Sequence, residues 1–537
     1  MSCSNRCLFV AYLACVLLGS SALAQHEHGA VDAAAFGNVS FPISCSPTVQ
    51  IDFNRAVALL HSFWYKKSEE TFAAVAKADP TCGMAEWGVA MSHFRQLWDP
   101  PTPGDVQTAW PAVQRAKSAG AKTQRERDYI SAIEVVYKDA DTKPYADRAV
   151  AYENAMQQIY ERYPEDIEAK IFYALAVRAN APVADKTYAS QKKASAILEK
   201  LFALYPTHPG LAHYIIHCDD YSTLAPLALN AARRYAKIAP DAPHALHMPA
   251  HIFTRLGLWQ ESIDSNRASA AVAKKNGLAG DQLHAMDYLV YAYLQQGRDR
   301  EAMSVESEMP KIPATDAGYF AGLFATASIP SRLAIERHRW SDAAALTLPP
   351  NTFPGEHYLW TEADLYFAQG LGAARGKNLE AANAGLQRLI SLRDKLLATH
   401  NGYAANQVDI QRGAVVAWIS FAEGKAEALT QMRAAADQED ASDKLPVSPG
   451  AIVPPRELLG DMLLEAKQPA QALAAYEASL KLAPERLNSL AGAARAAQSS
   501  GDREKASKYY AKVLANCPKA DAERREVREA QHFLAQK

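Results

Sequence analysis

The chain has 537 residues, more than the roughly 100–200 of one compact domain, so it holds several cores or one repeated unit. Hydrophobic residues make up 49% and charged residues 22%, a soluble composition that excludes disordered and collagen-like chains. Lysine and arginine (57) nearly balance aspartate and glutamate (59), which leaves a net charge of −2. Since this charge provides no broad basic surface, we expect no nucleic-acid partner.

The N-terminus has the pattern of a secretory signal peptide. A weakly basic start precedes an apolar stretch from Cys7 to Leu18, and Ala22-Leu23-Ala24 provides an Ala-x-Ala cleavage site. Cys15 leaves a lipoprotein acylation site as an alternative. No later stretch is apolar over the roughly 18 residues that a membrane span needs. We expect a signal peptide over 1–24, a leader over 25–48, secretion or export to a bacterial periplasm, and no integral membrane segment after cleavage.

Four cysteines follow the predicted cleavage site: Cys45, Cys82, Cys218 and Cys517. Four cysteines allow three full pairings. Cys45 lies just before the first predicted helix and Cys82 just after the helix that pairs with it. We therefore favour a Cys45–Cys82 disulfide that closes this helical hairpin. The alternative is that all four are small buried hydrophobic residues.

Like residues recur with a period of 34 near the C-terminus. The pairs are Ala472 and Ala506, Tyr476 and Tyr510, and Pro484 and Pro518. This is the period of the tetratricopeptide repeat, in which small residues let two antiparallel helices approach and an aromatic residue fills the gap above them. Alanine-rich stretches with helical spacing dominate, and few β-branched residues alternate. The sequence predicts an all-α tetratricopeptide-type solenoid, a right-handed superhelix of antiparallel helix pairs.

Breaks rich in proline and glycine suggest how the chain is divided. The last of them spans Pro446 to Pro455 and separates a long first part from the 34-residue repeats. We expect a solenoid over 49–440, a proline-rich linker over 441–455, a C-terminal repeat pair over 456–519 and a capping helix over 520–537.

Four runs of the sequence resemble a large family of exported bacterial tetratricopeptide-repeat proteins. They are FNRAVALLHSFWYKKSEETFAAVAKADPTCGMAEWGVAMS, HPGLAHYIIHCDD, YAKIAPDAPHALHMPAHIFTRLGLW and KLPVSPGAIVPPRELLGDML. The similarity covers nearly the whole mature chain, and the two histidine-rich runs are its most specific part. This family is mostly uncharacterised beyond its repeats. The resemblance therefore implies the fold and bacterial export, and implies little about function.

Histidines are concentrated in one region, with six of the 15 between residues 208 and 251. Within this region and the next repeat, His, Asp and Tyr recur three or four residues apart, which places them on one helical face. In proteins resembling this repeat, the corresponding slots of the first helix face the concave groove. We expect one groove surface formed by His213, His217, Asp220, His244, His247, His251, His284, Asp287 and Tyr291.

Imidazole nitrogens and carboxylate oxygens are ligands for Zn, Cu, Fe or Ni. The pairs His213/His217 and His247/His251 on neighbouring helices predict a four-histidine site for a transition metal (Zn, Cu or Fe). The aspartates could instead orient the rings. Pro249 weakens the spacing argument, because a helix that starts there would leave His244 and His247 in a loop. The alternatives are a groove that binds peptides, or a structural network of His–Asp hydrogen bonds.

The common signatures of zinc proteases, serine hydrolases and nucleotide-binding loops are absent from the sequence. The leading hypothesis is an exported scaffold that binds a peptide or protein partner in its groove, with a metal site as an added feature. The alternative is a metal-dependent hydrolase or oxidase with Asp220 or Asp287 as base. His26 and His28, next to the predicted new N-terminus, could bind copper loosely, although a flexible leader is the simpler interpretation.

Overall fold

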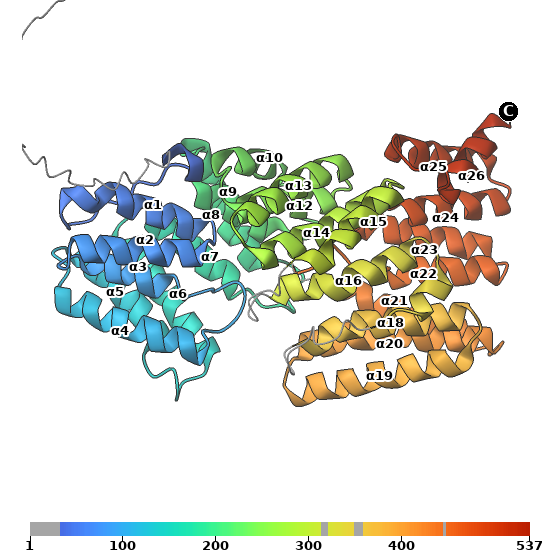
Figure 1. Ribbon diagram of the computed structural model, residues 1–537, viewed down its shortest axis with the longest axis horizontal. Coiled ribbons are helices and arrows are strands. Elements are labelled where there is room, and N and C mark those ends of the chain that lie inside the picture. Colours follow the sequence, from blue (N-terminus) through green and yellow to red (C-terminus); the bar gives the residue numbers. More distant parts are fainter. Residues whose placement is uncertain (1–32, 313–319, 348–357, 444–446, 537) are drawn as a thin grey trace, which may run out of the picture.

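The computed structural model describes residues 33–312, 320–347, 358–443 and 447–536 (Figure 1). Within these ranges the chain forms α-helices and short 3-10 helices and no strand. The predicted signal peptide and the first part of the predicted leader lie outside the described residues. The prediction of an all-α helical-repeat solenoid is confirmed. Among the described helices, none has both the length and the hydropathy that a membrane span requires.

The N-terminal part of the solenoid, blue to teal in Figure 1, stacks successive helices side by side. Short turns join these helices, so consecutive helices run antiparallel. Their bounds are α1 Gln50–His61, α2 Tyr65–Ala78, α3 Gly83–Met91, α4 Pro103–Ala119, α5 Gln124–Tyr137, α6 Tyr145–Arg162, α7 Ile167–Ala179, α8 Ala189–Leu204 and α9 Pro209–Asp219.

The middle of the chain continues the stack, in green to yellow in Figure 1. Here α14 packs against both α13 and α16, and these contacts connect the N-terminal part of the stack to the C-terminal half. The bounds are α10 Leu229–Ile238, α11 Pro243–His247, α12 Pro249–Arg255, α13 Trp259–Lys275, α14 Ala279–Gln295, α15 Asp299–Glu308, η3 Met309–Lys311, α16 Phe320–Glu336 and α17 Trp340–Ala344.

The C-terminal half, orange to red in Figure 1, holds the 34-residue repeats and ends in a short helix on α25. Its bounds are α18 Leu359–Arg375, α19 Leu379–Ala398, α20 Gly402–Ala422, α21 Ala428–Asp440, α22 Pro455–Glu465, α23 Pro469–Leu482, α24 Leu487–Ser499, α25 Arg503–Asn516 and α26 Arg525–Ala535. Buried apolar residues form three clusters in chain order, over 36–253, 259–333 and 334–533.

Small residues let the paired helices approach, as the repeat pattern predicts. A Cβ atom on Gly492 would lie 2.4 Å from the ring of Tyr476, and one on Gly88 would lie 2.2 Å from the ring of Phe72. The aromatic ring of one helix therefore fills the space above a glycine of its neighbour, and even alanine would clash at these positions.

The predicted leader is part of the fold from residue 33 onward. It contains η1 (Ala33–Phe36) and η2 (Pro47–Val49), and Phe41 between them is fully buried. The Phe41 ring packs against Phe53 and Trp87, each with ring centroids 5.6 Å away. A disulfide joins Cys45 to Cys82 and fixes this segment to the turn before α3. Cys218 and Cys517 are buried thiols.

The proline-rich segment between α21 and α22 is not a free linker. Ser448, Ile452 and Val453 are buried. The guanidinium of Arg332 on α16 donates to the carbonyl oxygens of Ala451 (2.8 Å) and Gly450 (3.2 Å). The segment 447–453 therefore packs into the solenoid instead of separating two units. The sequence predicts a linker here, but the donor to the backbone carbonyl groups of this segment comes from a distant helix, α16.

The C-terminal repeats also contact the middle of the chain. Arg486 donates to Glu336 at the end of α16 (2.8 Å) and to the Tyr291 hydroxyl on α14 (3.0 Å). The indole Nε1 of Trp259 donates to the carbonyl oxygen of Glu485 (2.9 Å). These contacts place α24 beside α14 and bury the face of α14 that carries Tyr291.

Candidate metal centre

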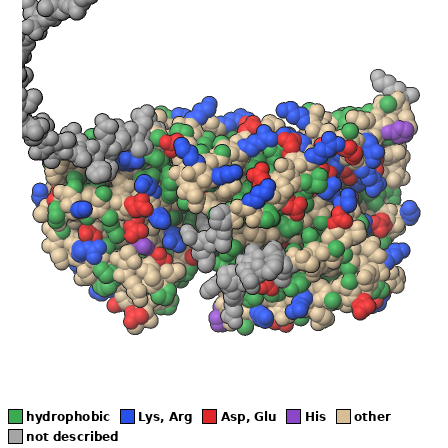
Figure 2. Space-filling model, in the orientation of Figure 1, with side chains coloured by type: hydrophobic (Ala, Val, Ile, Leu, Met, Phe, Trp, Pro, Cys, Tyr) green, Lys and Arg blue, Asp and Glu red, His purple; other side chains and the backbone are tan. Residues whose placement is uncertain are grey.

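Six histidines from three adjacent parts of the solenoid form two groups. His213, His217 and His244 make the outer group, and His247, His251 and His284 make the inner group. In each group the ligand nitrogens all lie within 4.8 Å of one another. All six rings are buried except that of His244, which is half-buried. The face of the molecule shown in Figure 2 accordingly has few histidines on its surface, where acidic and basic side chains intermingle.

The two groups meet on α11, which carries His244 of the outer group and His247 of the inner group just before its junction with α12. Pro249 has no N–H to donate into the preceding turn, so a second helix begins there. The backbone nevertheless stays helical across Met248, whose N–H donates to the carbonyl oxygen of His244 (2.9 Å). His244 and His247 are therefore helical residues of α11, and the expectation that they would lie in a loop if a helix started at Pro249 does not hold.

The predicted four-histidine set is distributed over both groups. His213 Nε2 lies 3.1 Å from His244 Nε2, and His247 Nε2 lies 2.9 Å from His251 Nε2. The ring of His284 on α14 lies 4.3 Å from that of His247, measured between centroids. The structure thus pairs His213 and His217 with His244, and His247 and His251 with His284. This grouping corrects the prediction of one ion held by the two i, i+4 pairs.

Hydrogen bonds fix the orientation of the inner rings. His247 Nδ1 donates to Asn266 Oδ1 (2.6 Å), and the amide of Asn266 is oriented by its donation to the Ser262 carbonyl oxygen (2.8 Å). His251 Nδ1 donates to Asp220 Oδ2 (2.9 Å), whose other oxygen accepts from Arg255 (2.8 Å). With both Nδ1 atoms engaged in this way, the Nε2 atoms of the two rings face each other at 2.9 Å.

The outer group is oriented in a similar way. His213 Nδ1 donates to the backbone oxygen of His61 (2.6 Å), which leaves its Nε2 unprotonated toward His244. His217 Nε2 is buried and has no hydrogen-bond partner among the described residues. Burial, together with neighbouring imidazoles, lowers the pKa of His213, His217 and His244 well below the usual value. The rings are therefore neutral near pH 7, the form that binds metal ions.

Two aromatic side chains lie over the outer group. The ring of Phe63 is 4.4 Å from that of His213 and 5.6 Å from those of His217 and His244. Trp98 lies 5.5 Å from His217. Phe63 adopts a left-handed backbone conformation (φ 55°) that non-glycine residues rarely adopt. Both aromatic rings are half-buried, so the outer group lies nearer to solvent than the inner group.

The other predicted groove residues do not line an open surface. Asp220 is buried behind His251 and Arg255. Asp287 pairs with the buried Arg332 (3.3 Å), and Tyr291 accepts from Arg486. Asp287 therefore belongs to the contact between α14 and α16, and Tyr291 to the contact between α14 and the C-terminal half, which repeat register alone does not reveal.

A third group is a hydrogen-bond network between helices. The carboxylate of Glu168 lies between His61 Nε2 (2.8 Å) and His208 Nε2 (3.0 Å). Burial favours a raised pKa for Glu168, but His61 and His208 outweigh it and hold this pKa well below the usual value. A Cβ atom on Gly210 would lie 2.8 Å from His61 Nδ1, so glycine permits this close approach. This is the structural type of histidine contact that the sequence left as an alternative.

Sequence reasoning missed Asn266 and the backbone oxygen of His61. Asn266 is fully buried on α13, where an asparagine costs free energy unless its amide is hydrogen-bonded. A polar residue at a helix position that the repeat pattern predicts to be buried could have identified Asn266 from the sequence. The acceptor at His61 has no sequence signal, because any residue has a backbone carbonyl.

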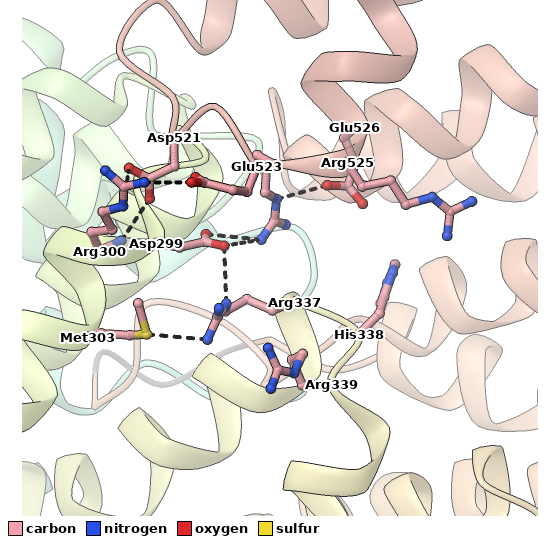
Figure 3. Close-up of a pocket in the computed structure, with 11 residues that line it drawn as sticks. Asp299, Arg300, Met303, Arg337, His338, Arg339, Asp521, Glu523, Arg525 and Glu526 are labelled. Atoms are coloured by element: carbon pink, nitrogen blue, oxygen red, sulfur yellow. Dashed lines mark hydrogen bonds and ion pairs between the residues drawn. The ribbon is translucent and has the colours of Figure 1, made fainter.

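A surface cavity of about 560 Å³ lies away from the histidine groups (Figure 3). Arginines and carboxylates line it and neutralise one another. Arg337 and Arg524 both bind Asp299, and Arg300 binds Glu523 (2.7 Å). Since these charges are paired, the cavity presents no concentrated charge to a ligand.

No family model and no curated protein matches the chain. Among solved structures, the human IFIT1 dimer with m7Gppp-AAAA aligns at 12% identity and a TM-score of 0.34, covering 81% of this chain and 90% of that one. Naa15/Naa10 bound to HypK aligns at 13% identity and a TM-score of 0.25, covering 87% and 70%. This chain has a tetratricopeptide-like helical-repeat fold. At these TM-scores the structural similarity does not indicate a function.

Proposed function

We propose that this protein binds transition-metal ions through the outer and inner histidine groups, and that it does so after export to an oxidising compartment. The observation that carries the proposal is the pair of Nε2 atoms of His247 and His251, 2.9 Å apart, with both Nδ1 atoms already committed as donors. Two unprotonated nitrogens at this distance repel unless a proton or a cation lies between them. A metal ion bound to both at about 2.0–2.1 Å would separate them by roughly 2.9–3.4 Å.

The ligand set indicates the kind of metal. Neutral imidazoles without thiolates suit Zn, Cu, Fe or Ni and do not suit Mg or Ca. The partners behind the rings are a carboxylate, an amide oxygen and a backbone oxygen, which is the arrangement that orients metal-binding histidines in proteins.

Metal binding is better supported than an open peptide groove at these residues. The predicted groove residues are buried, and a peptide that reached Asp287 or Tyr291 would have to displace the segment 447–453 or Arg486. A partner would therefore bind elsewhere on the solenoid. Asp220 and Asp287 are each paired with an arginine, which leaves neither in the position of a general base.

The Cys45–Cys82 disulfide supports the proposed compartment, because disulfides persist in secreted and periplasmic proteins and are rare in the cytosol. The signal-peptide pattern of residues 1–24 also supports export.

Elemental analysis of the protein purified without chelator tests the metal proposal. We expect at least one Zn, Cu, Fe or Ni per chain, and loss of that metal when His217→Ala and His251→Ala are combined. The matched control is His532→Ala, since His532 is exposed on α26. Metal at about 100 times its Kd should also add about 2.7 kcal/mol to the free energy of unfolding. Absence of bound metal after incubation with each ion would overturn the proposal.

A further inference from the structure

The outer and inner groups are immediate neighbours. His244 belongs to the outer group and His247 to the inner group, yet both are on α11, with ring centroids 6.3 Å apart. The two groups therefore adjoin on α11, with His213 of α9 beside His244 and His284 of α14 beside His247.

Charge balance limits how two ions can occupy this region. All six rings are neutral ligands, and the nearby carboxylate of Asp220 is already paired with Arg255. Two divalent ions would therefore place four positive charges in a buried site, which is unfavourable without compensating anions. One hydroxide between the ions lowers this charge by one and binds both ions, as in two-metal sites with separations of about 3.5–4 Å.

We propose that the two histidine groups form a single two-metal centre, with one ion on each group and a bridging hydroxide between them. The hydroxide forms from a water molecule that releases one proton to solvent, so no oxidant or reductant is involved. This inference rests on the proposed metal-binding function and adds the number of ions and their direct interaction.

Cu²⁺ is the probe, since each ion carries one unpaired electron. The full mature chain is titrated with Cu²⁺ and measured by electron paramagnetic resonance, in a His26→Ala/His28→Ala background that removes copper binding near the N-terminus. We expect two Cu²⁺ per chain and an integrated signal well below two spins, because ions joined by one bridge couple their spins. His532→Ala should leave both results unchanged.

Single substitutions separate the two ions. His217→Ala in the outer group and His284→Ala in the inner group should each leave one Cu²⁺ per chain with the full signal of one spin. A second measurement avoids any effect of substitution on folding. Loading the protein with one Cu²⁺ for every nine Zn²⁺ should restore nearly one spin per bound copper, because Zn²⁺ has no unpaired electron and most copper ions then have zinc as their neighbour.

The outcomes distinguish this inference from the function on which it rests. Two Cu²⁺ per chain with two full, independent spins would overturn the two-metal centre and leave metal binding intact. A single Cu²⁺ per chain would do the same. A signal per copper that stays low when Zn²⁺ replaces most of the copper would also overturn it. Absence of Cu²⁺ binding to the histidine groups would overturn both proposals.

Discussion

Asn266 shows how a single residue without charge can prepare a metal site. Its Oδ1 accepts from His247, and its Nδ2 is held by the Ser262 carbonyl oxygen, so the amide cannot rotate without losing a hydrogen bond. The ring of His247 is thereby kept in the tautomer that directs a lone pair at the proposed ion.

We predict that Asn266→Ala weakens metal binding by about 10–100-fold, the usual effect of removing an orienting partner of a ligand. Competition with a chelator of known affinity measures the change. The control is Asn276→Ala, an exposed asparagine at the end of the same helix. Equal affinities of folded Asn266→Ala and unsubstituted protein would show that Asn266 does not orient a ligand.

Asp364 on α18 is a second residue whose surroundings determine its chemistry. It is 2% exposed, accepts from Gln411 (2.7 Å), and its Oδ2 has no hydrogen-bond partner among the described residues. Burial raises its pKa to about 7, with Asp287 acting in the same direction and Arg332 against it. The folded protein therefore keeps Asp364 protonated at pH values where the unfolded chain ionises it.

This raised pKa gives a signed prediction for stability. Between about pH 4 and pH 7 the folded state binds the extra proton, so the contribution of Asp364 falls as the pH rises and is constant above pH 7. Asp364→Asn should match the original protein near pH 4 and exceed its unfolding free energy by about 4 kcal/mol at pH 8. Denaturant unfolding at both pH values measures the difference. A difference independent of pH would contradict the raised pKa.

At the scale of elements, the disulfide links the segment before η2 to the turn between α2 and α3. It closes a loop with a sequence separation of 37 residues, which predicts about 4 kcal/mol of stabilisation through the unfolded chain. Cys45→Ser/Cys82→Ser should lose about this amount in denaturant unfolding.

The control for the disulfide is Cys218→Ser, which removes a buried thiol and no bridge. A reducing agent should destabilise the original protein and leave the double variant unaffected. Equal sensitivity of both proteins to the reducing agent would show that the bridge contributes nothing.

The elements themselves could be predicted well from the sequence. The 34-residue period and the pairing of glycine with an aromatic ring identify the helix pairs, because both reflect packing between neighbours in the chain. The spacing of His213 and His217 likewise places both rings on one side of α9, where the structure has them.

What could not be predicted depends on contacts between distant residues. The sequence marks Pro249, but it does not show that α11 turns His244 toward α9 while His247 faces His284. The segment 447–453 has the composition of a linker, and only the tertiary fold brings Arg332 to its carbonyl groups. Local patterns thus identify the ligand types and leave their grouping open.

At the scale of the whole molecule, Arg486 joins the C-terminal repeats to the middle of the solenoid. It is fully buried and lies between the carboxylates of Glu336 (2.8 Å) and Glu457 (2.9 Å), with the Tyr291 hydroxyl as a third partner. Without the guanidinium, two buried carboxylates would lie close together without a cation.

We predict that Arg486→Ala lowers the free energy of unfolding by about 3–5 kcal/mol, as for a buried ion pair that loses one partner. Arg486→Met keeps most of the side-chain volume and should retain most of this loss, which assigns it to charge instead of packing. The control is Arg528→Ala, an exposed arginine on α26. Denaturant unfolding of the three variants provides the comparison. An Arg486→Met variant as stable as the original protein would contradict the electrostatic explanation.

Helical-repeat proteins generally gain or lose whole repeats in evolution, because each repeat touches only its neighbours. This chain differs, since the segment 447–453 and Arg486 connect α14 and α16 with repeats more than 100 residues later. An added helix pair between α16 and α21 would move those partners out of reach. The array therefore has a fixed number of repeats, and it should tolerate insertions only in surface turns.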